Sequence, residues 1–213
     1  MKLTAALFIA ASCLLPSAFA DEPAALDDFE LFAEKPATRN MLSDLRKGGY
    51  VLFMRHGQTD SSRPDRVPNV DLDDCMTQRP LSKEGRRVAT KVGAAIRRAR
   101  IPVGEVYSSP LCRATESTVL AFGKKYTVNN LLAYTSNMTN EEKAPIIAAT
   151  RELLSRPVEG RVNRVLVAHA PNLMDIIGYF PKEGAVAIFK PLGNNQFAYL
   201  ASVTAPQWAA LLK

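Results

Sequence analysis

The chain has 213 residues, of which 47% are hydrophobic and 23% are charged. This composition excludes a disordered or low-complexity chain, and the length suffices for one domain with a full core. The net charge of +6 favours an anionic partner, but the basic residues form no cluster interleaved with aromatic residues, so we expect no nucleic-acid binding.

The first twenty residues have the features of a secretory signal peptide. Lys2 supplies a basic start, residues 3–15 are almost wholly apolar, and residues 18–20 (AFA) have the small-x-small form that signal peptidase accepts. We expect cleavage after Ala20, a periplasmic or secreted protein, and no stable membrane insertion of the mature chain. The alternative is an uncleaved N-terminal anchor.

The remaining chain divides into a lead-in, residues 21–47, with a short helix near residues 40–47, and one domain, residues 48–213. Within the domain, short apolar strands alternate with amphipathic helices. The predicted strands are residues 50–54, 103–107, 126–132, 164–168, 185–189 and 197–203, and the predicted helices are residues 83–100, 110–122, 140–154, 171–180 and 207–212. This order predicts an α/β three-layer sandwich with a mostly parallel central sheet flanked by helices.

Two features of the intervening segments bear on function. Residues 57–81 form a long polar loop, and long loops in compact domains are commonly functional. Ser109 is predicted to cap the helix that starts at Pro110, and Thr139 with Glu142 forms the pattern of a capping box.

Both histidines of the chain lie just after a predicted strand. His56 follows residues 50–54, and His169 follows residues 164–168. Because the carboxyl ends of parallel strands lie at one edge of a sheet, the two rings meet there if these strands are neighbours. Arg113 belongs to a helix that starts near the same edge.

Such a cluster suits a phosphate group. The guanidinium groups of Arg55 and Arg113 match phosphate oxygens, and backbone N–H groups of residues 109–111 at a helix start are expected to add donors. Positive neighbours are expected to lower the pKa of His56, which leaves a neutral, nucleophilic ring. Gly57 is expected to let the backbone approach the ligand.

Less specific interpretations compete with this one. Each histidine, taken singly, fits a hydrogen-bonded core residue, and Arg113 fits a surface charge. A metal site built from the histidines with Asp71, Asp73 or Asp74 is a further alternative, although flanking arginines disfavour it.

Four segments in order resemble the histidine phosphatase superfamily, first branch, the phosphoglycerate mutase-like type. They are RHGQT (55–59), PLSKEGRRVA (80–89), VYSSPLCRATESTVLAF (106–122) and VLVAHAPNL (165–173). The resemblance implies that His56 is the phosphorylated nucleophile and that Arg55, Arg113 and His169 form the phosphate pocket, with Gly57, Gln58 and Thr59 as substrate-binding positions. It implies no cofactor and no metal.

One part of the family pattern is missing. Many members carry a glutamate proton donor after the third strand, where this chain reads LLAY (131–134). Glu141 and Glu142 are the nearest carboxylates, although a capping box and the helix dipole also explain them. Other candidates are Asp60 and the aspartates of residues 71–74.

The expected function is therefore that of an exported phosphatase. Its substrate is a small phosphomonoester, for which a phosphorylated sugar or glycan is one candidate. The alternatives are a non-catalytic module that binds phosphorylated ligands and a phosphotransferase or mutase. The oligomeric state is not indicated by the sequence.

Two cysteines, Cys75 and Cys112, remain after signal removal. An even number of cysteines in an exported chain is typical of a disulfide, and the alternative is two separate buried thiols. A disulfide here connects the 57–81 loop to the helix of Arg113.

Overall fold

The computed structural model describes residues 32–213, and residues Phe32–Lys213 form one compact unit. The predicted signal peptide, residues 1–20, and the first part of the lead-in lie outside the described residues. Within residues 32–213, none of the helices combines the length and the apolar character that crossing a membrane requires.

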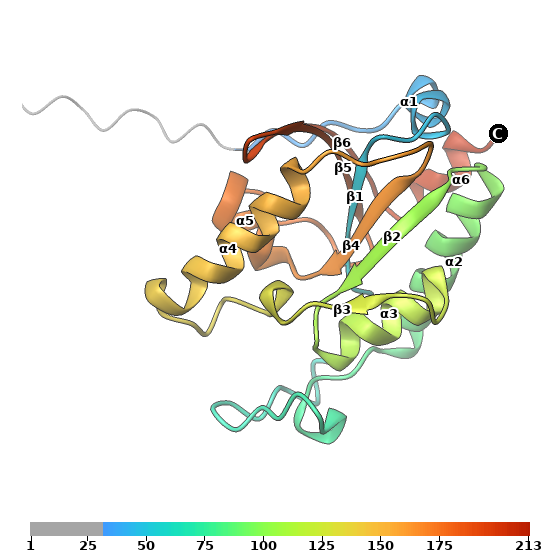
Figure 1. Ribbon diagram of the computed structural model, residues 1–213. Helices are drawn as coiled ribbons and strands as arrows, with labels where there is room; N and C mark the ends of the chain where they lie inside the picture. The colour runs from blue at the N-terminus through green and yellow to red at the C-terminus, as the bar shows by residue number, and fades with distance from the viewer. Residues whose placement is uncertain (1–31) are drawn as a thin grey trace, which may run out of the picture. The chain divides into compact units, whose positions relative to one another are not determined.

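A six-stranded sheet forms the middle layer (Figure 1). Its strands are β1 (Val51–Arg55), β2 (Val103–Ser108), β3 (Thr127–Val128), β4 (Asn163–Ala168), β5 (Val186–Gly193) and β6 (Gln196–Val203). Their order is β3-β2-β4-β1-β5-β6. The four strands from β3 to β1 are parallel, and β5 and β6 are antiparallel to their neighbours. The predicted α/β sandwich with a mostly parallel sheet is confirmed.

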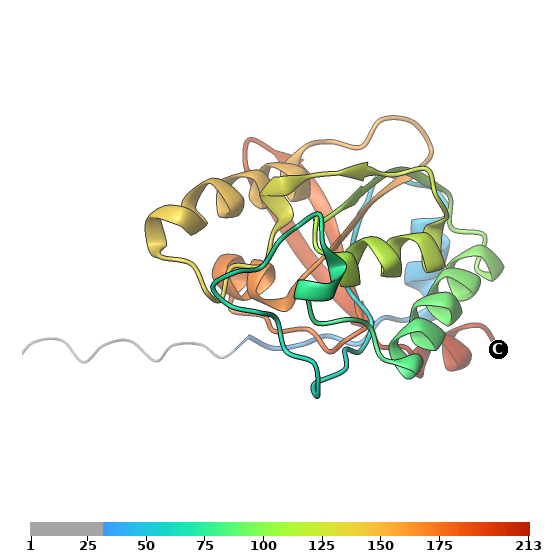
Figure 2. The same cartoon turned by 90° about the horizontal axis from the view of Figure 1, so that it is seen from below.

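Helices cover both faces of this sheet (Figures 1 and 2). They are α1 (Arg39–Leu45), α2 (Lys83–Arg98), α3 (Cys112–Phe122), α4 (Asn140–Ser155), α5 (Ala170–Ile177) and α6 (Gln207–Leu211), with short 3-10 turns η1 (Cys75–Thr77) and η2 (Asn130–Leu132). Side chains alternate across β1, so that Leu52 and Met54 pack in the cluster with α1, α2, α3 and α6. Val51 and Phe53 pack in the cluster with α4 and α5. Burial on both faces explains why β1 is a continuous apolar run.

Several predicted boundaries differ from the structure by one to four residues, and two of these differences bear on the site. The helix expected from Pro110 begins at Cys112, with Leu111 at its N-cap. Ser109 is instead bound outside the helix, since its N–H donates to the carbonyl of Val167 and its hydroxyl contacts His169. The strand expected over residues 126–132 is only two residues long, since the Asn129 side chain accepts the N–H of Leu131 and starts η2.

The described part of the predicted lead-in is packed against the domain. Leu42 and Leu45 of α1 are buried in the same cluster as Leu52. Pro36 forms a β-bridge with Ser202. Residues 32–47 are therefore attached to the domain.

The 57–81 loop lies beyond the carboxyl ends of β2 and β4 (Figure 1). A disulfide joins Cys75 in this loop to Cys112, the first residue of α3, with a Cα–Cα distance of 5.7 Å. The pairing expected from the sequence is thus present. It fastens the loop next to Arg113.

Candidate active site

The two histidines meet at the carboxyl edge of the sheet. Strands β1 and β4 are parallel neighbours, with Arg55 in register with Ala168, so His56 and His169 leave the sheet at the same level. Their ring centroids are 5.1 Å apart, and both side chains are buried. The condition for the two rings to meet, that these strands are neighbours, is fulfilled, and it brings together residues that are far apart in the chain.

The hydrogen bonds of His56 define which nitrogen is free to react. Its Nδ1 lies 2.8 Å from the carbonyl oxygen of Gly57, which can only accept, so Nδ1 carries the proton. The Nε2 atom of the neutral ring then has a free lone pair. Burial, followed by the positive charge of Arg113, lowers the pKa of His56 to about 3. The sequence attributed the lower pKa to Arg55, which contributes less than burial and Arg113 do.

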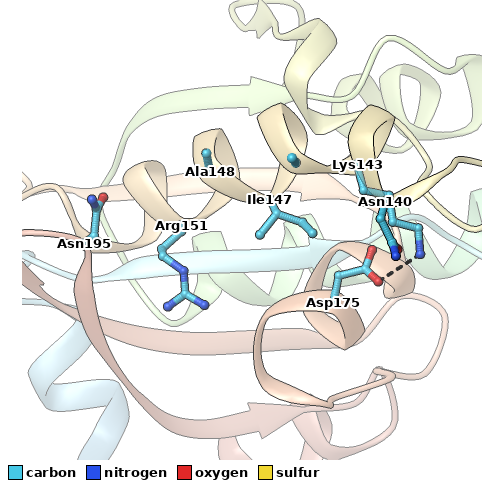
Figure 3. Close-up of a pocket in the computed structure, with 8 residues that line it drawn as sticks. Asn140, Lys143, Ile147, Ala148, Arg151, Asp175 and Asn195 are labelled. Atoms are coloured by element: carbon cyan, nitrogen blue, oxygen red, sulfur yellow. Dashed lines mark hydrogen bonds and ion pairs between the residues drawn. The ribbon is translucent and has the colours of Figure 1, made fainter.

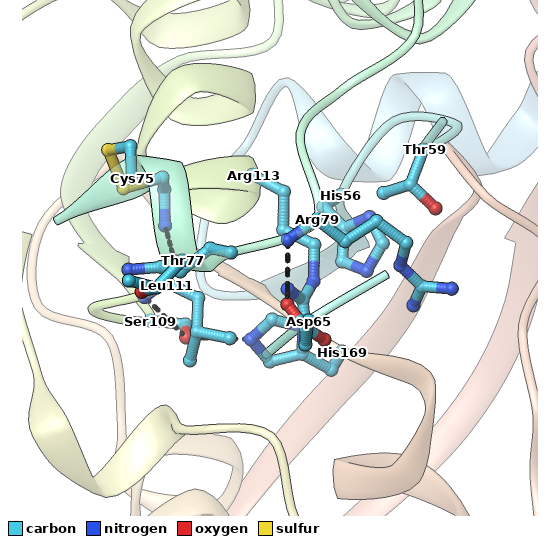
Figure 4. Close-up of polar contacts among 12 residues, drawn as sticks. His56, Thr59, Asp65, Cys75, Thr77, Arg79, Ser109, Leu111, Arg113 and His169 are labelled. Carbon is cyan, nitrogen blue, oxygen red and sulfur yellow. Dashed lines mark hydrogen bonds and ion pairs between the residues drawn. A yellow bond between two sulfur atoms is a disulfide. The ribbon is translucent and has the colours of Figure 1, made fainter. Parts of the chain in front are cut away.

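Arg113 lies at the centre of the cluster (Figure 4). Its side chain is fully buried, and one guanidinium nitrogen, Nη1, donates to Asp65 over 2.9 Å. The same carboxylate oxygen of Asp65 accepts the backbone N–H of Arg79 at 2.7 Å. The guanidinium carbon of Arg113 lies 5.3 Å from the centroid of the Tyr134 ring. A charge in this position is inconsistent with the interpretation of Arg113 as a surface residue.

Arg55 is held from the opposite side of the cluster. It donates to the carbonyl oxygen of Pro181 over 2.8 Å, and its other terminal nitrogen lies 3.5 Å from Glu183. Glu183 also accepts from the hydroxyl and the backbone N–H of Thr59. Burial lowers the pKa of Arg55, although an arginine remains charged under these conditions. Thr59 is thus linked to Arg55 through a shared carboxylate.

His169 is fixed by two polar contacts. Its Nε2 lies 2.7 Å from the hydroxyl of Ser109, and its backbone N–H donates to the Asn172 side chain. Burial and the neighbouring His56 ring keep the pKa of His169 well below its usual range. Ser109, predicted as a helix cap, instead orients this ring.

Unsatisfied nitrogen atoms are concentrated around these residues. Among the residues that the structure describes, five buried nitrogens of the cluster have no hydrogen-bond partner: Arg55 Nε, Arg79 Nε, Arg113 Nε, Arg113 Nη2 and His169 Nδ1. Buried donors without partners are costly, so native structures rarely gather them. A ligand with several acceptor oxygens, such as a phosphate group, would satisfy them together.

The expected helix-terminal donors are not free. The N–H of Ser109 is bound to the Val167 carbonyl, and that of Leu111 contacts the Ser109 hydroxyl. The N–H of Cys112 donates to Gln78. The prediction that residues 109–111 present backbone donors to the anion is therefore wrong, because the helix starts later and each of the two N–H groups is used locally.

Two of the predicted substrate-binding positions have other neighbours. The N–H of Gly57 donates to Ser117, and a Cβ on Gly57 would lie 2.4 Å from the carbonyl oxygen of Gly85. Glycine is required there by the close approach of α2. The side chain of Gln58 contacts Ser82 and lines a different cleft, beside Lys91.

The candidate acids lie on or near α4. Glu142 completes the predicted capping box, with its carboxylate accepting the N–H of Thr139 over 2.8 Å. Both glutamates are exposed, and of the two only Glu142 lines a cleft next to Asp65. Neither glutamate hydrogen-bonds to the residues of the histidine cluster.

The aspartates of the alternative metal site remain within the 57–81 loop. Asp71 accepts the N–H of Asp73, Asp74 caps η1, and all three are exposed. In the part of the chain that the structure describes, no three His, Cys, Asp or Glu side chains gather in a metal-binding group. These aspartates do not join His56 and His169.

Three residues in contact with the cluster were not singled out from the sequence. Asp65 and Arg79 come from the 57–81 loop, and Glu183 precedes β5. Nothing in the local pattern distinguishes them from other charged loop residues, since their positions depend on how the loop folds back. The length and polarity of the 57–81 loop, which indicate a functional loop, were the only sequence feature that pointed to Asp65 and Arg79.

Two clefts lie near this end of the molecule. One, of about 440 Å³, is lined by Asp65, Leu111 and Tyr134 and opens beside Arg113. A larger one, of about 610 Å³, is lined by Lys143 and Arg151 of α4 and by Asp175 of α5 (Figure 3). No residue of the histidine cluster lines the larger cleft. The smaller one is lined by Asp65, which pairs with Arg113, and Arg113 itself lines a separate hollow beside the disulfide.

The fold and the site define an α/β protein in which two histidines and two arginines gather at the carboxyl edge of a mostly parallel sheet. The sequence model of the histidine phosphatase superfamily (branch 1) matches residues 51–132, the segment from β1 to η2. No curated protein sequence matches the chain.

Solved structures share the fold at low sequence identity. The protein histidine phosphatase SixA, complexed with tungstate, is 17% identical, with a TM-score of 0.51 over 74% of this chain and 98% of that one. The product of an open reading frame of Mycobacterium tuberculosis is 15% identical, with a TM-score of 0.53 over 73% and 98%. A mycobacterial glucosyl-3-phosphoglycerate phosphatase in complex with VO3 is 18% identical, with a TM-score of 0.50 over 72% and 98%.

Proposed function

We propose that this protein is an exported phosphatase that hydrolyses a phosphomonoester through a phosphohistidine intermediate on His56. One observation supports this most strongly. A buried imidazole with a free Nε2 lone pair is surrounded by five unpartnered nitrogens from Arg55, Arg79, Arg113 and His169. A phosphate group needs a nucleophile and several donors in the same place, and this arrangement supplies both.

The reaction has two steps. In the first, the lone pair of His56 Nε2 attacks phosphorus, the N–P bond forms, and the ester P–O bond breaks as the alcohol leaves with a proton. In the second, water attacks phosphorus and loses a proton, and the N–P bond breaks to give inorganic phosphate and the neutral ring. Arg55, Arg113 and His169 stabilise the charge on the transferred oxygens in both steps.

The proton for the leaving alcohol is proposed to come from Glu142. Asp65 is already engaged by Arg113, whose Nη1 donates to it over 2.9 Å. Glu142 lines the cleft that adjoins the site. A Glu142→Gln variant tests this role, because its rate should fall with alkyl phosphates and remain close to wild type with p-nitrophenyl phosphate, whose leaving group needs no protonation. Equal loss with both substrates would exclude Glu142 as the acid.

Export is supported by the disulfide. Cys75 and Cys112 are bonded, and disulfides persist mainly in oxidising compartments such as the periplasm and the extracellular space. The signal-like features of residues 1–20 point to the same location. Detection of the chain in a periplasmic or secreted fraction, with an N-terminus at residue 21, would test this part of the proposal.

The central test uses the fact that the chain has two histidines. The purified protein is incubated with p-nitrophenyl phosphate, quenched, and mapped by mass spectrometry for phosphohistidine. We expect phosphate on His56 alone and loss of hydrolysis in a His56→Ala variant that keeps the wild-type circular dichroism spectrum. A His169→Ala variant serves as the control, because it should turn over slowly and still acquire the label on His56. Hydrolysis that survives His56→Ala would contradict the mechanism.

A further inference from the structure

The cleft of about 440 Å³ lies next to the phosphate-binding cluster. Two of its lining residues contact that cluster. Asp65 is paired with Arg113, and the Tyr134 ring lies 5.5 Å from the His169 ring and 5.3 Å from the Arg113 guanidinium. A phosphate group bound to Arg113 would therefore have the rest of its molecule directed along this cleft or past its mouth.

The walls of the cleft are mainly apolar. Six of the apolar residues that line it are Val67, Pro68, Val70, Leu72, Leu111 and Met138. Val67 and Leu72 keep 56% and 43% of their surface exposed, so they contribute little to the core of the protein. Large apolar side chains grouped on the wall of a cleft are characteristic of ligand sites.

The charges of the cleft are also distinctive. Asp65 and Glu142 are the charged residues that line it, and within residues 32–213 no lysine or arginine does so. The cations of the site are instead gathered on the side of His56. The phosphate end of a ligand thus meets positive charge, and the other end meets apolar walls with two carboxylates.

Building on the phosphatase function proposed above, we propose that this cleft holds the alcohol part of the substrate, and that the substrate is the phosphate ester of a neutral, apolar alcohol. An aromatic ring or a branched alkyl group would cover the exposed parts of Val67 and Leu72 and would stack near Tyr134. The cleft volume of about 440 Å³ is within the range of small-molecule sites.

The same walls disfavour the other substrate classes. A phosphorylated sugar would place hydroxyl groups against Leu72 and Met138, where they would lose water without gaining partners. An anionic alcohol such as a glycerate would find no cation on these walls, since Asp65 and Glu142 are the charged residues that line the cleft. The structure therefore favours an apolar alcohol over the sugar suggested by the sequence.

The test compares esters with the same leaving-group chemistry. Benzyl phosphate and glucose 6-phosphate are both esters of primary alcohols, so a difference in kcat/KM reports recognition of the alcohol; 3-phosphoglycerate is the anionic comparison. We expect kcat/KM for benzyl phosphate to exceed that for either of the others by at least about tenfold, the scale of discrimination in hydrophobic pockets.

Two variants locate the preference in the cleft. Leu72→Ser should reduce the ratio of kcat/KM for benzyl phosphate to that for glucose 6-phosphate by about fivefold. Leu192→Ser is the matched control, because Leu192 is an exposed apolar residue of β5 that does not line this cleft. It should leave the ratio unchanged.

The outcomes separate this inference from the proposed function. Hydrolysis that depends on His56 but prefers glucose 6-phosphate, or a ratio that is insensitive to Leu72→Ser, would overturn the inference alone. If none of the esters is hydrolysed and His56 is not labelled, the proposed function fails. In that case, titration calorimetry with benzylphosphonate and methylphosphonate still tests the cleft. Equal affinity of the protein for the two compounds would overturn the inference, and tighter binding of benzylphosphonate would support it.

Discussion

A single methyl group on α2 should disable the site without unfolding the protein. Gly85 packs against the backbone of Gln58, two residues after His56, and a Cβ at position 85 would lie 1.9 Å from the Gln58 carbonyl oxygen. Cβ atoms do not approach other atoms closer than 3.0 Å, so the two backbones must separate by about 1.1 Å in a Gly85→Ala variant.

The expected loss of activity follows from this displacement. A shift of about 1 Å in a reacting group reduces the rate by about a hundredfold. A displacement of Gln58 reaches His56 because the preceding residue, Gly57, accepts the hydrogen bond of the His56 ring. The stability cost is smaller. Overpacking costs about 1–3 kcal/mol, and alanine in a helix recovers about 1 kcal/mol, so Tm should fall by a few degrees.

Gly93→Ala provides the matched control. A Cβ there would lie 2.1 Å from the backbone oxygen of Ala121, near the end of α3 and about two turns from Arg113. Both variants should lose similar Tm in calorimetry, but kcat/KM for p-nitrophenyl phosphate, measured well below Tm, should fall about a hundredfold only in Gly85→Ala. A fully active Gly85→Ala variant, or a folded Gly93→Ala variant that is equally inactive, would refute the reasoning.

Three further predictions concern stability and anion binding. Burial lowers the pKa of His56 to about 3, so the unfolded chain binds more protons than the folded one below pH 6.5. His56 should therefore reduce the free energy of unfolding in urea by about 2 kcal/mol between pH 7 and pH 5, and His169, whose pKa burial also lowers, acts in the same direction. A His56→Gln variant with an unchanged pH dependence would contradict this. The Cys75–Cys112 bond spans 37 residues, so replacing both cysteines with serine should cost about 4 kcal/mol, and an unchanged urea midpoint would show that the loop is fixed by other contacts. Asp65→Asn frees the Arg113 guanidinium of a competing carboxylate and should lower the inhibition constant of inorganic phosphate about tenfold, whereas a higher constant would mean that Asp65 assists anion binding.

The sequence was most informative where one local rule applied without competition. The strands of His56 and His169 were predicted because they are apolar runs buried on both faces, and the capping box of Thr139 and Glu142 forms as expected. The cap assigned to Ser109 failed because a neighbouring strand and His169 both bind this residue. Such competition cannot be read from the residues that flank it.

The alternation of strands and helices, the polar loop and the placement of both histidines after apolar strands are properties of the chain itself, since they follow from periodicity and local chemistry. The partners of the charged groups were decided only by tertiary structure. Asp65 reaches Arg113 and Glu183 reaches Arg55 across 48 and 128 positions of the chain, and no local pattern encodes contacts at such separations. Burial lowers the pKa of His56 more than the charge of neighbouring Arg55 does. This burial likewise arises only when the sheet and its helices pack together.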